Sequence, residues 1–484
     1  MSRPRPFSDG ADTLRVRARP SVVALTLAKH APIFALLYLP PAAWAAVSRD
    51  WSITAALCAP ALIALGVYAA VQSRPLPQDL RRVEAMVSVA LVFLLGAMGA
   101  VPTFVIAGMP LADALFEAMS GLTTTGLSVA AAPDDWPFVL HVLRAWLQWI
   151  GGLVMATAVL ALLLPAGVPT QRLGQAGFSE GDRIASTRTK ARQLLGVYLG
   201  LTVIMTAATA LVIPDWREAL VLTLSGISTG GFAPRSDSLA SYTVWGQSVV
   251  MLTCLLGALS LVSFVLILQG KWRAAWRTGS ARRVGLTVLA LALAAVALAH
   301  TTERGDPYGV FLDMVSATTT AGYSVGVMPI AGPVFILFLV AMVLGADSGS
   351  TGGGIKLARL GLFLRAARHT LRAPSLPKSA LAPLRQDSER VDDAVIIGGL
   401  ALVMLYTAAA VLLVTQFAWH GYPLAESLFD SLSALSTVGL STGIVGADLP
   451  LDLKLSLTFA MWLGRLEFIA VLVLLTPRTW LKGP

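Results

Sequence analysis

Residues 433–440 read SALSTVGL, and the same eight-position pattern occurs three more times along the chain. The other copies are SGLTTTGL at 120–127, SGISTGGF at 225–232 and SATTTAGY at 316–323. Every copy has serine first, threonine fifth, glycine seventh and an apolar or aromatic residue last. A single Thr-x-Gly carries no information, but four copies in register predict a fourfold internal repeat that organises the whole chain.

The composition indicates a protein that crosses a membrane many times. Of its 484 residues, 56% are hydrophobic and 13% are charged, and the mean hydropathy is +0.73. A soluble domain carries about 25% charged residues, so this chain has too few to coat several soluble domains. Cys58 and Cys254 both lie in apolar segments, which argues against a disulfide framework and a cysteine metal site.

Ten apolar stretches are long enough to span a bilayer, which needs about 20 residues. They are 21–47, 52–72, 84–107, 137–165, 191–213, 243–269, 285–300, 330–368 with an interruption, 393–418 and 454–477. An even number of spans puts both termini on one side. Of the 36 Lys and Arg residues, 28 lie in the termini and loops of that side, so both termini are predicted to be cytoplasmic. The net charge of +9 is thereby explained without a nucleic-acid partner.

Each copy of the pattern follows a stretch of about 11 moderately apolar residues, such as 111–122 or 423–435, which is too short to cross a bilayer. We therefore predict an all-α integral membrane fold in which four re-entrant pore helices alternate with the spans, as pseudo-fourfold helix–pore–helix repeats. The predicted units are a cytoplasmic N-terminus with two extra spans at 1–82 and pore repeats at 83–168, 169–273, 274–370 and 371–484.

The residue types in the pattern suit the binding of a dehydrated monovalent cation. Rings of backbone carbonyls replace water around such an ion without adding formal charge that would trap it. Carbonyls of successive residues reach one axis only where the backbone adopts conformations that glycine allows, which explains the repeated glycine. The predicted filter residues are Thr123, Thr124, Thr125, Gly126, Ser228, Thr229, Gly230, Gly231, Thr319, Thr320, Ala321, Gly322, Ser436, Thr437, Val438 and Gly439.

The copy at 436–440 is close to the Thr-Val-Gly-Tyr-Gly filter of potassium channels. From about residue 83 to its end, the chain also resembles the TrkH, TrkG and KtrB family of bacterial potassium-uptake proteins, to which plant HKT transporters are similar. Besides the four copies, the resemblance is carried by FEAMSG at 116–121, QWIGG at 148–152, GSTGGGIK at 349–356 and GRLE at 464–467. The two extra spans before residue 83 resemble the TrkH branch.

The resemblance implies a potassium-selective translocation subunit in the bacterial inner membrane, with K⁺ as the transported ion. It further implies a homodimer with one pore per subunit, and a cytosolic ring related to TrkA that binds nucleotide and gates the pore. In the HKT relatives a serine at the first filter glycine is associated with sodium transport, so Gly126 favours potassium.

The eighth span is interrupted by the segment GADSGSTGGGI at 345–355. A helix does not tolerate so many glycines at about 1 kcal/mol each, and a polar loop at membrane depth must line water or be buried in protein. Both the position below the filter and the resemblance indicate an intramembrane gate. A Walker phosphate loop is excluded because Leu357 follows Lys356, so no nucleotide is expected in this chain. The predicted gating residues are Asp347, Ser348, Gly349, Ser350, Thr351, Gly352, Gly353, Gly354, Lys356 and Arg465.

Several charges lie at predicted membrane depth, where an ionisable residue indicates a functional site. Arg465 is interpreted as a cation beneath the filter, with a structural tie to carbonyls as the alternative. Asp347, where the family usually has a small residue or cysteine, is predicted to pair with Arg465, and Arg144 to meet Glu117. Acidic residues nine places before the glycine recur in three copies and are expected either to stabilise helix N-termini or to support the filter or attract cations: Glu117, Asp313 and Asp430.

Three other functions compete with a potassium conduit. The chain could be the potassium-translocating subunit of an ATP-driven pump, or a sodium-coupled or sodium-permeable cation transporter. An intramembrane enzyme is the third, but the five histidines are dispersed and neither His-Glu-x-x-His nor Gly-x-Gly-x-x-Gly occurs. The chain is therefore predicted not to be an enzyme.

Overall fold

The computed structural model describes residues 17–77, 80–158, 180–299, 306–372, 385–386, 389–390 and 393–480. These residues are predominantly helical, and their one sheet is a small antiparallel hairpin of β1 (Arg385–Gln386) and β2 (Glu389–Arg390). The predicted repeat boundary at 168 and most of the basic N-terminus lie outside the described residues.

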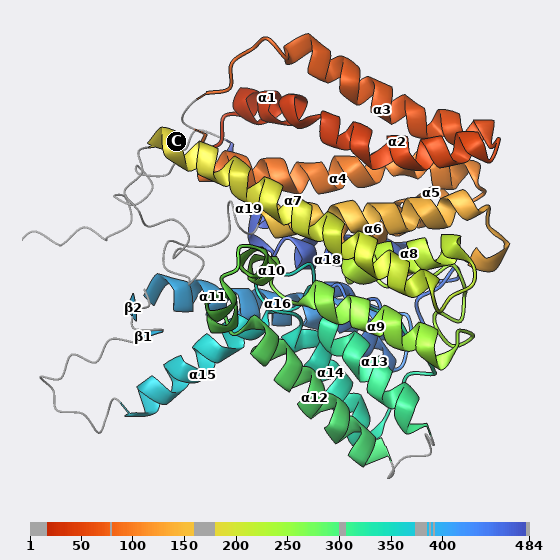
Figure 1. Ribbon diagram of the computed structural model, residues 1–484, viewed down its shortest axis with the longest axis vertical. Helices are drawn as coiled ribbons and strands as arrows, with labels where there is room; N and C mark the ends of the chain where they lie inside the picture. Colours follow the sequence, from red (N-terminus) through yellow and green to blue (C-terminus); the bar gives the residue numbers. More distant parts are fainter. Residues whose placement is uncertain are drawn as a thin grey trace, which may run out of the picture.

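Long helices lie side by side through the molecule (Figure 1). Seven helical stretches in the described residues are long and apolar enough to cross a membrane. They are α1 (Pro20–His30) with α2 (Pro32–Val47), and then α3 (Trp51–Val71), α4 (Arg82–Ile106), α6 (Phe138–Ala158), α7 (Glu180–Ala210), α12 (Ser280–Ala299) and α16 (Asp393–Trp419). The chain is thus a multi-pass membrane protein.

Two further pairs of helices pass the same test only when each bent pair is counted as one span, which gives up to nine among the described residues. The bend is 88° between α9 (Val244–Ala258) and α10 (Leu261–Leu268), and 117° between α18 (Leu451–Arg465) and α19 (Ile469–Leu475). The stretches 243–269 and 454–477 were predicted as uninterrupted spans, and this is wrong. At the second bend Glu467 and Phe468 have positive φ angles of 52° and 64°, which a continuing right-handed helix cannot contain.

The eighth predicted span is interrupted, as expected. It consists of α14 (Gly332–Leu344) and α15 (Leu357–Arg372), joined by the predicted gating segment. The total of ten spans stays a prediction, because α14 has only 13 residues.

Four short helices precede the four copies of the glycine pattern. They are α5 (Leu111–Leu122), α8 (Trp216–Ile227), α13 (Pro307–Thr319) and α17 (Leu424–Leu435). Two of these helices have an aspartate N-cap. The Asp306 side chain accepts hydrogen bonds from backbone N–H groups in the first turn of α13, and the Asp215 side chain accepts one in the first turn of α8. Each then ends at the polar residues of its pattern.

These short helices form a closed circuit with the long helices. Each contacts the helix that follows the glycine pattern of the preceding unit: α6 contacts α8, α9 contacts α13, α14 contacts α17, and α18 contacts α5. Within three of the units, glycines permit a close approach between the short helix and the helix that follows it. A Cβ atom at Gly151, Gly257 or Gly464 would overlap the carbonyl oxygen of Leu122, Ile227 or Leu435, each the last residue of a short helix.

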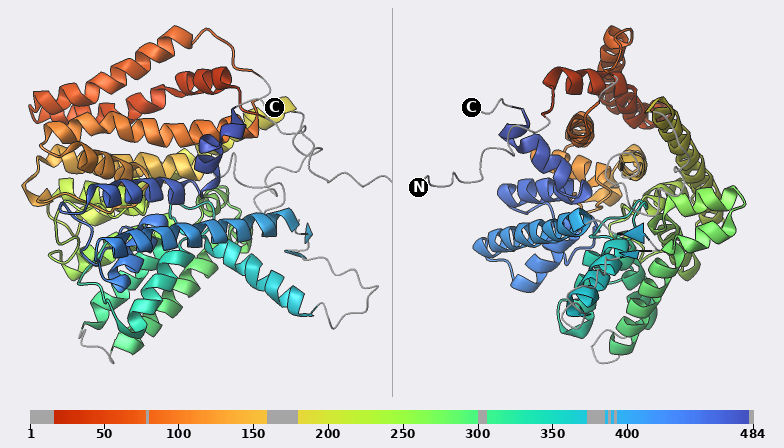
Figure 2. Two further views of the ribbon diagram at one scale, coloured as in Figure 1. Left: turned by 180° about the vertical axis from the view of Figure 1, so that it is seen from behind. Right: turned by 90° about the vertical axis from the view of Figure 1, so that its left-hand side faces the viewer.

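The first three helices lie outside this circuit. Seen nearly along the helices, α1 to α3 (red to orange-red) occupy the edge of the molecule (Figure 2, right). They pack on α4 and α6, and the Tyr38 hydroxyl donates a 2.6 Å hydrogen bond to the carbonyl oxygen of Gly96.

Candidate functional site: a ring of four glycines and the loop beneath it

The four pattern glycines meet in one ring, hereafter the glycine ring: Gly126, Gly231, Gly322 and Gly439. A Cβ atom on each would overlap a backbone carbonyl oxygen of the next copy. The carbonyls concerned belong, in the same order, to Gly230, Ala321, Val438 and Thr125. The contacts run from the first copy to the fourth and back to the first, so segments more than 300 positions apart surround a common axis.

The backbone takes the same conformation in all four copies. The glycines have φ angles of 86°, 80°, 77° and 93° in chain order. The threonines two positions earlier also have positive φ: Thr124 (54°), Thr229 (53°), Thr320 (58°) and Thr437 (50°). A positive φ at a β-branched residue is a genuine outlier and typically marks a functional constraint. The glycine signal was readable in the sequence, whereas the threonine conformation was not.

The hydroxyls of these buried threonines differ in their bonding. Oγ1 of Thr320 accepts a 2.8 Å hydrogen bond from the Gly353 N–H, and that of Thr229 donates to the Ser228 carbonyl. The hydroxyls of Thr124 and Thr437 are buried and find no partner in the described part of the chain. Buried oxygens without partners are costly, and they fit a site that takes a desolvated cation.

Carboxylates on three of the short helices bind the backbone segment that follows the ring glycine. Glu117, Asp313 and Asp430 accept hydrogen bonds from the backbone N–H groups of Val129 (3.3 Å), Val325 (2.7 Å) and Thr442 (3.2 Å), each three positions after its glycine. The second copy has Leu222 in place of the acid, and three positions after Gly231 stands Pro234, which has no N–H to donate. The acids lie in the middle of their helices, so their expected role at helix N-termini is wrong and their support of the ring segment is what the structure shows.

Side chains of α6 reach the second copy. Arg144 Nε lies 3.0 Å from Glu117 Oε1 with both side chains buried, which confirms the predicted contact. The guanidinium also lies 3.9 Å from the centre of the Phe232 ring. Gln148 donates a 2.6 Å hydrogen bond to the Gly230 carbonyl and accepts one from the Phe232 N–H. This role of Gln148 was not predicted, although the residue is polar within an apolar helix and begins the QWIGG segment at 148–152.

Residues 345–355, hereafter the 345–355 loop, lie against the ends of three short helices. The Gly354 N–H donates to the Ser436 carbonyl at 3.0 Å, and the Gly353 N–H to Thr320. Oγ1 of Thr351 donates to the Ile227 carbonyl at 3.0 Å. The loop therefore touches the second, third and fourth copies directly behind their glycines.

Two buried cations hold this loop by its carbonyl oxygens. Arg465, 2% exposed, donates from Nη1 to the Thr351 carbonyl at 2.8 Å and from Nη2 to the Gly151 carbonyl at 3.4 Å. Lys356 Nζ donates to the Gly352 carbonyl. Arg465 is therefore tied to carbonyls, one of which belongs to the loop, and its role as a cation beneath the filter stays a prediction. Glu467, two positions after Arg465, pairs with Arg359: its Oε2 lies 2.5 Å from Arg359 Nη2.

The predicted ion pair between Asp347 and Arg465 is wrong. The Asp347 carboxylate, 1% exposed, pairs with Arg283, with distances of 2.8 Å to Nη2 and 3.2 Å to Nε. The sequence could not reveal that α12 (Ser280–Ala299) begins beside the loop. Its first turn brings Arg283 within ion-pair distance of Asp347.

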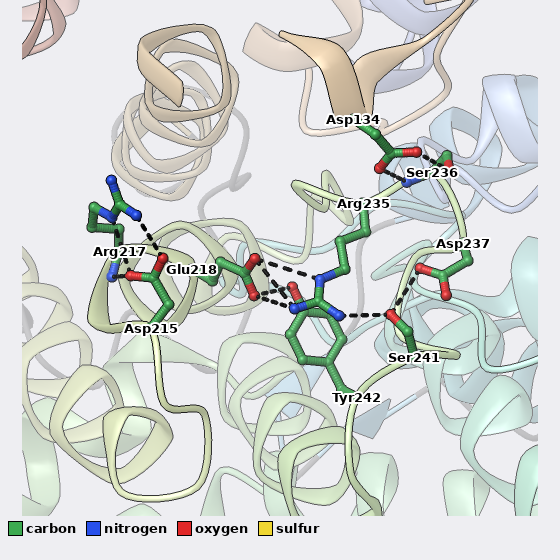
Figure 3. A network of polar contacts seen from close by, with 9 residues as sticks. All are labelled: Asp134, Asp215, Arg217, Glu218, Arg235, Ser236, Asp237, Ser241 and Tyr242. Atoms are coloured by element: carbon green, nitrogen blue, oxygen red, sulfur yellow. Dashed lines mark hydrogen bonds and ion pairs between the residues drawn. The ribbon is translucent and has the colours of Figure 1, made fainter. Parts of the chain in front are cut away.

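The loops at the opposite end of the molecule form a separate polar network (Figure 3). Arg235 pairs with Glu218 at 3.0 Å, and the Tyr242 hydroxyl donates to the same carboxylate at 2.8 Å. Asp134, in the loop after the first copy, accepts hydrogen bonds from the backbone N–H and hydroxyl of Ser236, after the second. These bonds hold the pKa of Asp134 below its ordinary value. They also tie two copies together on this face.

Comparison with known proteins agrees with this architecture. The family model for TrkH, described as a cation transport protein, matches residues 81–279 and 306–480. The Trk system potassium uptake protein TrkH of Halomonas elongata is 29% identical over 482 residues, which covers 93% of this chain and 97% of that protein. The protein of the same name from Escherichia coli K12 is 28% identical, covering 80% of this chain and 83% of that protein.

A solved structure is similar over nearly the whole length. The crystal structure of the potassium transporter TrkH from Vibrio parahaemolyticus aligns with a TM-score of 0.83 at 22% identity, covering 96% of this chain and all of that chain. The two proteins share a fold. Because the family model spans well over half of the sequence, this chain belongs to the TrkH family of cation transport proteins.

Proposed function

We propose that this protein is the translocation subunit of a Trk-type system and conducts K⁺ selectively into the cell through the glycine ring. The observation that carries the proposal is the closed circuit in which each ring glycine abuts a carbonyl oxygen of the next copy. Four equivalent segments of strained backbone around one axis supply stacked carbonyl oxygens, which replace the hydration shell of a potassium ion. The predicted filter residues are the four positions that end at each of these glycines.

The short helices add an electrostatic contribution. Each ends next to its filter segment, so its carbonyl terminus, which carries about half a negative charge, points to the region behind the ring. In this proposal they are re-entrant pore helices, and a cation behind the ring is favoured while an anion is repelled. The hydroxyls of Thr124 and Thr437, which have no hydrogen-bond partner among the residues that the structure describes, are available to the same ion.

The 345–355 loop is the proposed gate. It touches three of the four copies behind the ring, and Arg465 and Lys356 hold it there. Conduction requires these hydrogen bonds to break or rearrange so that the loop leaves the axis. Asp347, through Arg283 on α12, restrains the same loop from the other side.

The remaining parts of the proposal rest on the family. Relatives carry the name Trk system potassium uptake protein, which supports a role in a Trk system. From the resemblance to the family, we propose that the chain forms a homodimer and works with a TrkA-like cytosolic nucleotide-binding ring. We place the protein in the bacterial inner membrane with ten spans, pore repeats at 83–168, 169–273, 274–370 and 371–484, and both termini in the cytoplasm, on the basis of the distribution of Lys and Arg.

The test is rubidium uptake by liposomes that contain the purified protein. We expect uptake driven by an inward gradient or a negative interior potential, and competition by K⁺ well above that by Na⁺. Uptake that requires ATP and an ATPase subunit would assign the chain to a pump instead. Uptake that depends on a sodium gradient would identify sodium-coupled transport, and the absence of any rubidium flux would refute the proposal.

A further inference from the structure

The short helix α11 (Trp272–Arg277) presents an unusual surface. Its sequence is WRAAWR, so the two tryptophans are four positions apart and share one face, and the two arginines share the neighbouring face. Trp272 is 65% exposed and Trp276 is 70% exposed. These four side chains line an open groove of about 440 Å³, hereafter the α11 groove.

Positive charge in this segment is not balanced locally. No acidic residue occurs between Asp237 and Glu303, whereas residues 270–284 contain five Lys and Arg. Of these, Arg283 pairs with Asp347. The other four form no ion pair with any residue that the structure describes: Lys271, Arg273, Arg277 and Arg282.

The inner face of α11 is fixed, so the outward position of the groove is a stable feature. Ala275 is buried against Val262 and Leu266 of α10. The hydroxyls of Ser263 and Thr278 lie 2.9 Å apart at the same corner. Figure 1 places α11 at the end of the molecule where α4 begins and α19 ends, which is the cytoplasmic end in the proposed orientation.

We propose that the α11 groove binds the headgroup of an anionic phospholipid of the cytoplasmic leaflet. Indole rings favour the membrane–water interface, and each Lys or Arg near an anionic lipid surface strengthens binding. Arg273 and Arg277 provide guanidinium groups that bind phosphate oxygens through paired N–H donors. The adjacent Leu268, at the end of α10, is 76% exposed and matches acyl chains rather than water. The unbalanced charge selects an anionic lipid over a zwitterionic one.

Bound lipid at this place would lie close to the proposed gate. The α9–α10 bend contacts the 345–355 loop, because the Leu261 N–H donates to the Gly349 carbonyl at 3.0 Å and the Thr351 N–H to the Gly257 carbonyl at 3.2 Å. Two parts of this inference rest on the proposed function: the role of the 345–355 loop as a gate and the choice of the cytoplasmic leaflet. Binding itself is measured without ion flux, so failure of one proposal is distinguishable from failure of the other.

The experiment is native mass spectrometry of the detergent-purified full chain, titrated with phosphatidylglycerol or phosphatidylcholine of the same acyl length. The double variant R273Q/R277Q should bind phosphatidylglycerol about 5- to 30-fold more weakly. Its binding of phosphatidylcholine should weaken by a clearly smaller factor, because choline offsets the charge of the phosphate. The double variant W272L/W276L should bind both lipids more weakly. Controls at the opposite end of the molecule, Trp245→Leu (74% exposed) and Arg217→Gln, should bind both as the parent does.

The unmodified protein provides a test that does not depend on variants. Its binding of phosphatidylglycerol should weaken as ionic strength rises, and its binding of phosphatidylcholine should not. Unchanged phosphatidylglycerol affinity in R273Q/R277Q would overturn the proposal. So would competition by soluble glycerol phosphate at equal concentration, which would assign the groove to a small anion. A loss of dimer in W272L/W276L without added lipid would assign it to a second copy of the chain.

Discussion

Four threonines with positive φ occupy equivalent positions in the four copies of the pattern. A left-handed conformation at a β-branched residue costs on the order of 1–3 kcal/mol and persists only where the surroundings impose it. Here the neighbouring copy of the pattern imposes it, because each following glycine abuts a carbonyl oxygen of the next segment. The close contacts between copies therefore keep the threonine backbone in an unfavourable conformation, and they fix the geometry of the ring.

A methyl group in the glycine ring should strongly reduce conduction. Gly322→Ala places Cβ against the Val438 carbonyl and fixes an unfavourable φ of 77°. We expect rubidium uptake to fall by roughly tenfold or more, because overpacking costs about 1–3 kcal/mol at a position with no room to relax. Gly285→Ala is the matched control, since nothing lies within 4 Å of its Cβ position. Parental flux in Gly322→Ala would remove the ring from the pathway.

Asp347 and Arg283 should restrain the gate. Asp347→Asn and Arg283→Gln each remove an ion pair that anchors the 345–355 loop to α12. Because Arg283 is 37% exposed, the pair is worth about 1 kcal/mol, and we expect basal rubidium flux to rise roughly fivefold in each variant.

The double variant distinguishes the pair from two separate effects. The combined R283Q/D347N change should raise flux no further than either single change, because both remove the same interaction. Arg217→Gln breaks an exposed pair at the other end of the molecule and should leave flux unchanged. Additive effects, or no effect in either single variant, would dismiss the restraint.

At the scale of elements, hydrogen bonds join three of the short helices to the irregular segment that follows their ring glycines. In three copies a buried carboxylate in the middle of the helix binds the backbone three positions after the glycine. In the second copy Leu222 and Pro234 remove the acceptor and the donor together. From this matched loss we infer that the requirement is a satisfied N–H group and not a negative charge.

Asp430 allows this requirement to be tested. Asp430→Leu leaves the Thr442 N–H and hydroxyl without their acceptor, and each orphaned donor costs about 1–3 kcal/mol. Asp430→Asn retains an acceptor oxygen and should stay close to the parent. Thermal unfolding in detergent should therefore show a lower melting temperature for the leucine variant alone. Equal destabilisation by asparagine would indicate that charge is what matters.

The elements could be predicted from the sequence where the information is local. Residues 111–122 and 423–435 were expected as short helices, and the structure has Leu111–Leu122 and Leu424–Leu435. Apolar length, the repeated pattern and the glycine-rich interruption at 345–355 are all visible in the sequence. The bends after Ala258 and Arg465 were missed because each lies within a stretch that is long and apolar enough overall to read as one span.

Partners across the fold were predictable only in part. Arg144 and Glu117 were expected to meet because both are charges near the same end of adjacent helices. The partner of Asp347 was not, since the choice between Arg283 and Arg465 depends on how α12 and α18 approach the loop. The positive φ of the threonines was likewise invisible, because it contradicts their intrinsic preference.

At the scale of the whole molecule, the circuit of four copies must close between the last and the first. The contact of α18 with α5 makes this closure, and it contains a buried ion pair. Lys454 Nζ lies 2.6 Å from Asp113 Oδ1, with side-chain exposures of 8% and 7%. Lys454 also donates to the Ala447 carbonyl at 2.7 Å. Because the two residues are 341 positions apart, the pair joins the chain into a ring.

Removing one charge of the Lys454–Asp113 ion pair should destabilise the protein more than removing both charges. Asp113→Asn or Lys454→Met alone leaves a buried charge unpaired, which costs about 3–5 kcal/mol, whereas removing both charges is often nearly neutral. We expect both single variants to melt at clearly lower temperature and to lose rubidium flux, and D113N/K454M to recover most of both. Asp215→Asn, which breaks the exposed pair with Arg217, should change stability by about 0–1 kcal/mol. A double variant as unstable as the singles would show that the charges themselves, and not their pairing, are needed for the last copy to meet the first.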